Sequence, residues 1–63
     1  MANRLREIRT EQGLSKLELS RRSGVSRPTI IRLESDELPT VQTSTLVKIA
    51  DALGCSVAEI FFD

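Results

Sequence analysis

The side chains of this chain that could do chemistry are mostly cationic, and they gather in its first half. The 63 residues include no histidine and one cysteine, Cys55, so the usual groups for zinc binding and acid–base catalysis are nearly absent. Residues 1–33 carry eight Lys or Arg against three Asp or Glu, a net +5, whereas residues 34–63 carry one against six, a net −5. We therefore expect no catalytic residue, no metal and no cofactor. The charge split indicates a basic working face; ordinary solvated helix charges are the alternative.

One predicted helix exposes two arginines and two apolar residues on the same face. Arg27 and Arg32 fall on the solvent face of a predicted helix, together with Pro28 and Ile31. Each guanidinium can donate two hydrogen bonds to a guanine edge, and Pro28 or Ile31 could touch a thymine methyl. The alternative is an arginine-flanked surface helix with no ligand.

Three repeated tripeptides position these side chains: Gly13-Leu14-Ser15, Gly24-Val25-Ser26 and Gly54-Cys55-Ser56. In each, Gly can close one helix in the left-handed conformation and Ser can accept hydrogen bonds from the free N–H groups that open the next. The flanking apolar pairs fit hydrophobic staples: Leu14 with Leu19, Val25 with Ile30, and Cys55 with Ile60. Glu18 and Glu59 are placed to complete capping boxes, whereas the middle start has Thr29 in that place and Pro28 in its first turn.

The pattern predicts an all-α single domain over residues 1–63. Helices are expected over about 2–12, 16–23, 27–35, from 43–45 to 53, and 57–62, with a polar loop over 34–43 that Leu38 and Val41 pin to the core. The second and third helices are joined only by residues 24–26, so they should cross steeply as a helix-turn-helix. No apolar run is long enough for a membrane span and the first residues are not signal-like, so we expect a cytoplasmic protein.

Two stretches of the sequence together resemble the phage-repressor-like helix-turn-helix family, the Cro/cI or xenobiotic-response-element type. They are Leu14-Ser15-Lys16-x-x-Leu19-Ser20-x-x-x-Gly24-Val25-Ser26-Arg27-x-Thr29-Ile30-x-Arg32-Leu33-Glu34 and Leu46-Val47-Lys48-Ile49-Ala50-Asp51-Ala52-Leu53-Gly54. The resemblance runs from about Asn3 to Phe61. It implies a compact five-helix, lambda-repressor-like DNA-binding domain from a bacterium or phage, acting on a pseudo-palindromic operator as a homodimer.

The resemblance also assigns roles to individual residues. The base-reading positions fall on Arg27, Pro28 and Arg32, to which the exposed face adds Ile31. The phosphate anchor falls on Lys16, where relatives usually have Gln; the other expected phosphate contacts are Ser26, Thr29, Arg21, Arg22 and Thr43. Arg9 is expected to form a structural ion pair with Glu34, two solvated charges being the alternative.

Some positions depart from the family pattern. Ser35-Asp36-Glu37 stands where the family often has Asn-Gly and basic residues, and its acidic groups would repel phosphates. We expect Thr40, Gln42, Thr43 and the amides that open the fourth helix to substitute for the usual phosphate contacts of that loop. Of Phe61 and Phe62 we expect one ring in the core and one at a dimer interface; two core rings are the alternative. We expect Cys55 to be a buried staple residue rather than a redox group.

The sequence thus favours a DNA-binding transcriptional regulator, and among these a repressor, over an enzyme. A protein-interaction module on the same fold, such as an antitoxin or a controller subunit, is the alternative. The acidic second half of the chain would suit that role.

Overall fold

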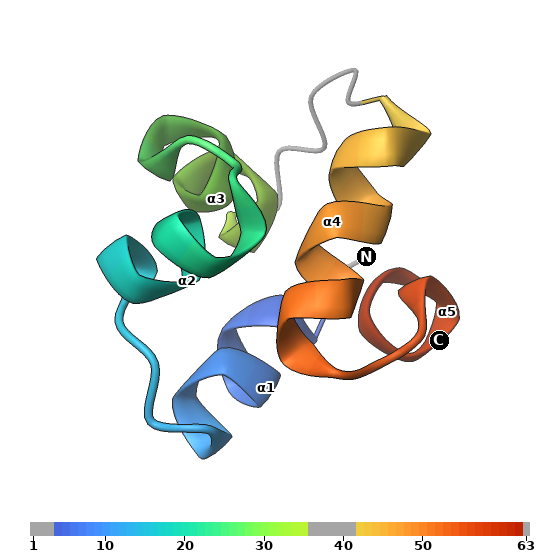
Figure 1. Cartoon of the computed structure of the whole chain (residues 1–63). Coiled ribbons are helices and arrows are strands. Elements are labelled where there is room, and N and C mark those ends of the chain that lie inside the picture. The colour runs from blue at the N-terminus through green and yellow to red at the C-terminus, as the bar shows by residue number, and fades with distance from the viewer. Residues whose placement is uncertain (1–3, 36–41, 63) are drawn as a thin grey trace.

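The fold consists of five α-helices, seen in a computed structural model that describes residues 4–35 and 42–62 (Figure 1). In chain order the helices are α1 (Leu5–Glu11), α2 (Lys16–Ser23), α3 (Arg27–Glu34), α4 (Thr43–Leu53) and α5 (Val57–Phe61). Within the described residues the rest is turn, bend and cap, without a strand. The predicted all-α, five-helix fold is confirmed.

The helix ends differ from the predicted ones by a few residues. The first helix was expected from residue 2, but Arg4 is not helical and its amide donates to the Ile60 carbonyl at 2.8 Å, tying this segment to α5. Three helices end one residue earlier than expected, at Glu11, Glu34 and Phe61. The predicted loop lies mostly outside the described residues, and so do Leu38, Thr40 and Val41.

The core draws on every helix. Its fully buried large side chains are Leu5 of α1, Leu19 of α2, Ile30 and Leu33 of α3, Ile49 of α4 and Ile60 of α5. The staple pairs predicted from sequence all join this cluster, although Cys55 is only partly buried. Because α3 is held by two residues with almost no exposure, its position relative to the other helices is fixed.

The three Gly-x-Ser corners differ in how they are capped. All three glycines have φ near +70°, as predicted. At Ser56 and Glu59 both halves of a capping box form. At Ser15 the hydroxyl accepts from the Glu18 amide, but the Glu18 carboxylate accepts from that hydroxyl at 3.4 Å instead of from the Ser15 amide, so the predicted reciprocal bond is absent.

Candidate nucleic-acid interface

The corner between α2 and α3 is built by residues 23–26. Gly24 ends α2 with φ 75°, and its amide donates to the Ser20 carbonyl at 2.9 Å. Ser23 is 9% exposed, and its hydroxyl donates to the Leu19 carbonyl at 2.7 Å while accepting from the Val25 amide at 3.2 Å. The hydroxyl therefore satisfies an amide that would otherwise be buried without a partner.

Ser23 is a residue that the sequence reasoning missed. Its signal was present, because Ser23 lies four positions after the core residue Leu19 and helical spacing places both on the buried face of α2. A buried serine hydroxyl needs a polar partner, and Ser23 has two, the Leu19 carbonyl and the Val25 amide.

The outer face of α3 carries the four residues predicted to read bases. Arg27, Pro28, Ile31 and Arg32 are all exposed, while Ile30 and Leu33 are buried on the opposite side. At about 100° per residue, positions 28, 31 and 32 point away from the core, on the side of α3 opposite Ile30 and Leu33. Arg27 lies at the edge of this outward-facing side. The structure thus brings two guanidinium groups and two apolar groups onto one exposed helix face.

The start of α3 departs from the expected cap. Ser26 occupies the N-cap position, yet its side chain accepts no backbone hydrogen bond, so the capping predicted there is wrong. Pro28 supplies no amide in the first turn, and the Ser26 hydroxyl pairs instead with the Thr29 hydroxyl at 2.8 Å. The two hydroxyls therefore satisfy each other at the start of α3.

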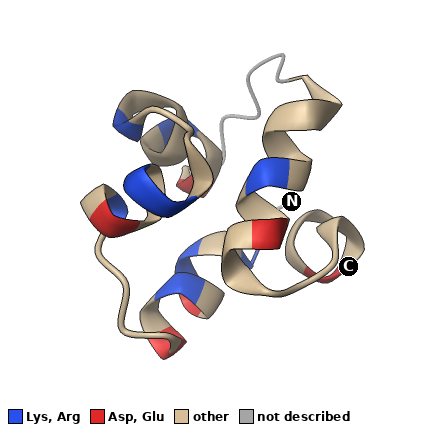
Figure 2. Cartoon of the chain, in the orientation of Figure 1, with Lys and Arg blue, Asp and Glu red and all other residues tan. Residues whose placement is uncertain are grey.

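Further cations flank α3, on α2. Lys16 at the start of α2 is half-buried, whereas Arg21 and Arg22 in its last turn are exposed. Among residues 4–35 and 42–62, none of the lysines and arginines of α2 and α3 forms an ion pair. Figure 2 shows cationic residues on α1, α2 and α3, while Lys48 is the sole cation of α4 and α5. Thr43, the first residue of α4, is exposed.

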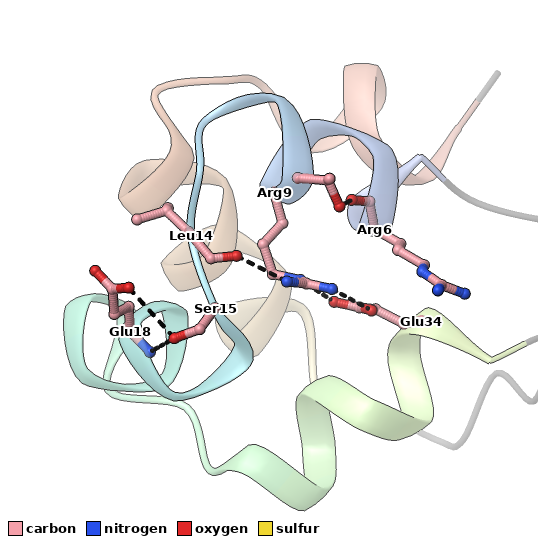
Figure 3. A network of polar contacts seen from close by, with 7 residues as sticks. Arg6, Arg9, Leu14, Ser15, Glu18 and Glu34 are labelled. Carbon is pink, nitrogen blue, oxygen red and sulfur yellow. Dashed lines mark hydrogen bonds and ion pairs between the residues drawn. The ribbon is translucent and has the colours of Figure 1, made fainter.

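A buried ion pair fixes the far end of α3 (Figure 3). Arg9 Nε donates to Glu34 Oε2 at 2.6 Å and Arg9 Nη2 donates to Glu34 Oε1 at 3.1 Å. The third donor, Nη1, reaches the Leu14 carbonyl at 2.7 Å. The side chains of Arg9 and Glu34 are 12% and 6% exposed, so they are not solvated charges. One guanidinium therefore joins α1, the segment between α1 and α2, and α3.

A second long-range link lies at the same C-terminal end of α1, at its C-cap residue Gln12. The Gln12 side-chain amide donates to the Leu53 carbonyl at 2.7 Å, across 41 positions of sequence. It satisfies one of the carbonyls that the end of α4 leaves without a helical partner. Sequence periodicity gave no indication of this bond.

The end of α5 separates the two phenylalanines. Phe61 packs partly buried against the core, whereas Phe62 is 63% exposed. One core ring and one exposed ring is the arrangement that a dimer contact at Phe62 requires. Cys55 is partly buried, with its thiol 3.6 Å from the Leu53 carbonyl.

Neither a metal site nor a membrane-spanning helix is found in residues 4–35 and 42–62. Histidine, cysteine and acidic side chains do not gather there in threes able to hold a metal ion. None of the helices in that part of the chain has the length and apolar content needed to cross a bilayer.

Two comparisons with known proteins were informative in different ways. The comparison with curated protein sequences finds no match. A helix-turn-helix family model matches residues 5–60, a range that covers all five helices up to Ile60. The matched range includes the corner between α2 and α3, the two arginines of α3 and the Arg9–Glu34 ion pair. The chain belongs to the Cro/cI-type helix-turn-helix family of DNA-binding regulators.

Proposed function

We propose that this protein is a repressor that binds a pseudo-palindromic operator as a homodimer, with α3 of each copy in the major groove. The observation that carries the proposal is the outer face of α3, where Arg27 and Arg32 are exposed and lack an acidic partner among the described residues. An α-helix with its side chains is about 10–12 Å across, which fits the roughly 12 Å width of the major groove. Repression needs occupancy alone, since a bound dimer blocks other proteins from the same DNA.

The size of the domain supports two copies on each operator. Its Cα atoms extend over 23 × 20 × 18 Å. Successive major grooves on one side of DNA are roughly 34 Å apart, so one copy spans a single half-site. Exposed Phe62 is the proposed contact between copies, with partly buried Phe61 supporting it from the core.

Contacts to the backbone of DNA supply affinity in this proposal. Lys16, Arg21 and Arg22 neutralise phosphates from α2, while the Thr43 hydroxyl donates to a phosphate oxygen. The Ser26 and Thr29 hydroxyls do the same once DNA opens the 2.8 Å hydrogen bond between them. Such contacts position the protein without reading sequence. The Arg9–Glu34 pair takes no part, because its charges are already neutralised and buried. The regulator would act in the cytoplasm, bound to chromosomal or phage DNA.

The test is selection of duplexes from a random library at two salt concentrations, with native mass measurement of the complex. We expect a two-fold-symmetric site bound by two chains. Arg27→Ala and Arg32→Ala should each relax preference at one base pair per half-site, at about 1–3 kcal/mol. Lys16→Ala should weaken all sequences alike and lower the salt slope by about 1.

Arg6→Ala is the matched control, because Arg6 is an exposed arginine of α1 that the proposal does not place on DNA. It should leave base preferences unchanged. Equal retention of selected and scrambled duplexes, together with a tight complex with another protein, would favour the interaction-module alternative instead.

A further inference from the structure

The centre of the DNA-facing side of α3 is apolar. Pro28 and Ile31 are spaced three residues apart, so their side chains are neighbours on the helix surface, and both are exposed, Ile31 to 45%. They lie on the side of α3 opposite the buried Ile30 and Leu33. The other large apolar side chains exposed in the described residues, Leu17, Val47 and Phe62, are single residues on three different elements.

This pair cannot read bases by hydrogen bonding. Neither side chain has a donor or an acceptor, and Pro28 also lacks a backbone amide. A polar base edge placed against them would lose its water without gaining a partner, which is unfavourable. The apolar group that a base pair presents in the major groove is the methyl at C5 of thymine. A cytosine methylated at C5 carries the same group at the same position of the ring.

The neighbouring side chains define what lies beside that methyl. Arg27 immediately precedes Pro28, and Arg32 immediately follows Ile31. Each guanidinium matches the two acceptors of a guanine edge. The face therefore combines an apolar surface for a methyl group with guanine readers next to it.

We propose that Pro28 and Ile31 recognise the 5-methyl group of a pyrimidine adjacent to a guanine, so that operator affinity depends on whether that methyl is present. The inference rests on the proposed function, because it requires α3 in the major groove. Thymine and 5-methylcytosine are the two sources of this group. A half-site carrying cytosine at that position would gain affinity when the cytosine is methylated.

The size of the effect follows from burial of one methyl group. Removing a methyl from an apolar contact should weaken binding about fourfold per half-site. Two half-sites changed together should lose about fifteenfold, if the two contacts act independently.

The experiment measures equilibrium binding to the selected operator by fluorescence anisotropy, using duplexes that differ at one thymine of each half-site. Uracil replaces thymine with loss of the methyl alone, and a second pair of duplexes carries cytosine or 5-methylcytosine there. At one or two positions we expect uracil to bind more weakly than thymine, and 5-methylcytosine more tightly than cytosine, each by the stated factors. If only the thymine pair responds, thymine is the source of the methyl.

Variants assign the effect to this face. Ile31→Ala, at an exposed position, should keep its fold and its guanine preferences while its thymine-to-uracil affinity ratio falls towards one, the remainder being the Pro28 contact. Val47→Ala is the matched control, since Val47 is also β-branched and is 42% exposed, and it should keep the full ratio.

Three results would overturn the proposal: a selected site without thymine, equal affinity for thymine and uracil at every position, or an Ile31→Ala variant that keeps the wild-type ratio. In each of these cases sequence-specific binding itself survives. Failure to select any site would instead refute the proposed function, and this inference with it.

Discussion

Replacing the buried Arg9–Glu34 pair tests the architecture that holds α3. The perturbation is a double-mutant cycle of Arg9→Met, Glu34→Leu and the two together. Each single substitution leaves one charge without its partner at a site where the side chains are 12% and 6% exposed. The double substitution removes both charges and leaves only the Leu14 carbonyl short of a donor.

The magnitudes separate the single from the double variants. Breaking a buried pair by removing one partner costs about 3–5 kcal/mol. A chain of 63 residues has a total unfolding free energy of about 3–9 kcal/mol, so each single variant should lose a third or more of it, and all of it where the total lies near the lower bound. The double variant should lose only about 1–3 kcal/mol, the cost of one unpaired carbonyl. The coupling free energy between the two positions should then reach about 3 kcal/mol or more.

Urea unfolding followed by far-ultraviolet circular dichroism measures the free energy of unfolding of each variant in the cycle. If a single variant is unfolded while the double variant is folded, that alone shows that the two side chains stabilise the fold as a pair. The matched control is the Arg4–Glu7 pair, whose side chains are 42% and 58% exposed at an N···O distance of 3.3 Å. The same cycle there should give a coupling below about 0.5 kcal/mol. Single losses under about 1 kcal/mol at Arg9 and Glu34, or a double variant as unstable as the sum of the singles, would refute the reasoning.

Three more outcomes can be checked. Gly24→Ala should cost about 1–2 kcal/mol in urea unfolding because of its φ of 75°, and Gly24→Asn less; since an added Cβ meets no atom within 4 Å, equal losses for the two would point to a cause other than backbone conformation. Ser23→Ala should cost about 1–3 kcal/mol by the same measurement, because it leaves the Val25 amide unpaired, and an unchanged midpoint would mean that this amide finds another acceptor. Phe62→Ala should change the unfolding free energy by less than about 0.5 kcal/mol but weaken self-association in analytical ultracentrifugation; an unaltered dimer constant would place the interface elsewhere.

Local patterns in the sequence predicted the elements well, because helix starts and stops depend on neighbours a few residues apart. The left-handed Gly24 and the reciprocal cap of Ser56 with Glu59 follow from short-range chemistry alone. The same logic failed at Ser26, where a proline two residues on removes an amide and a nearby threonine hydroxyl takes up the serine. Corners with the same Gly-x-Ser pattern can therefore be capped differently, depending on the residues of the turn that follows.

Contacts between distant residues left no such pattern. The 41-residue link from Gln12 to Leu53 follows from how α1 meets α4, which no periodicity encodes. The Arg9–Glu34 pair was expected only through the family resemblance, and the roles of the exposed arginines in DNA contact stay predictions. Exposure itself was predictable, since helical spacing placed Ile30 and Leu33 inside and Arg27 and Arg32 outside.

The division of α3 into a buried side and an exposed side has an evolutionary consequence. Ile30 and Leu33 keep the helix seated, whereas its four outward residues pack against nothing in the core. Exposed substitutions of this kind usually change stability by no more than about 0.5 kcal/mol. Under the proposed function, in which these residues read the DNA, such a helix can acquire a new target sequence by a few mutations without passing through an unfolded ancestor. Duplicated copies of the gene are then free to diverge in the promoters they control while inheriting the same scaffold.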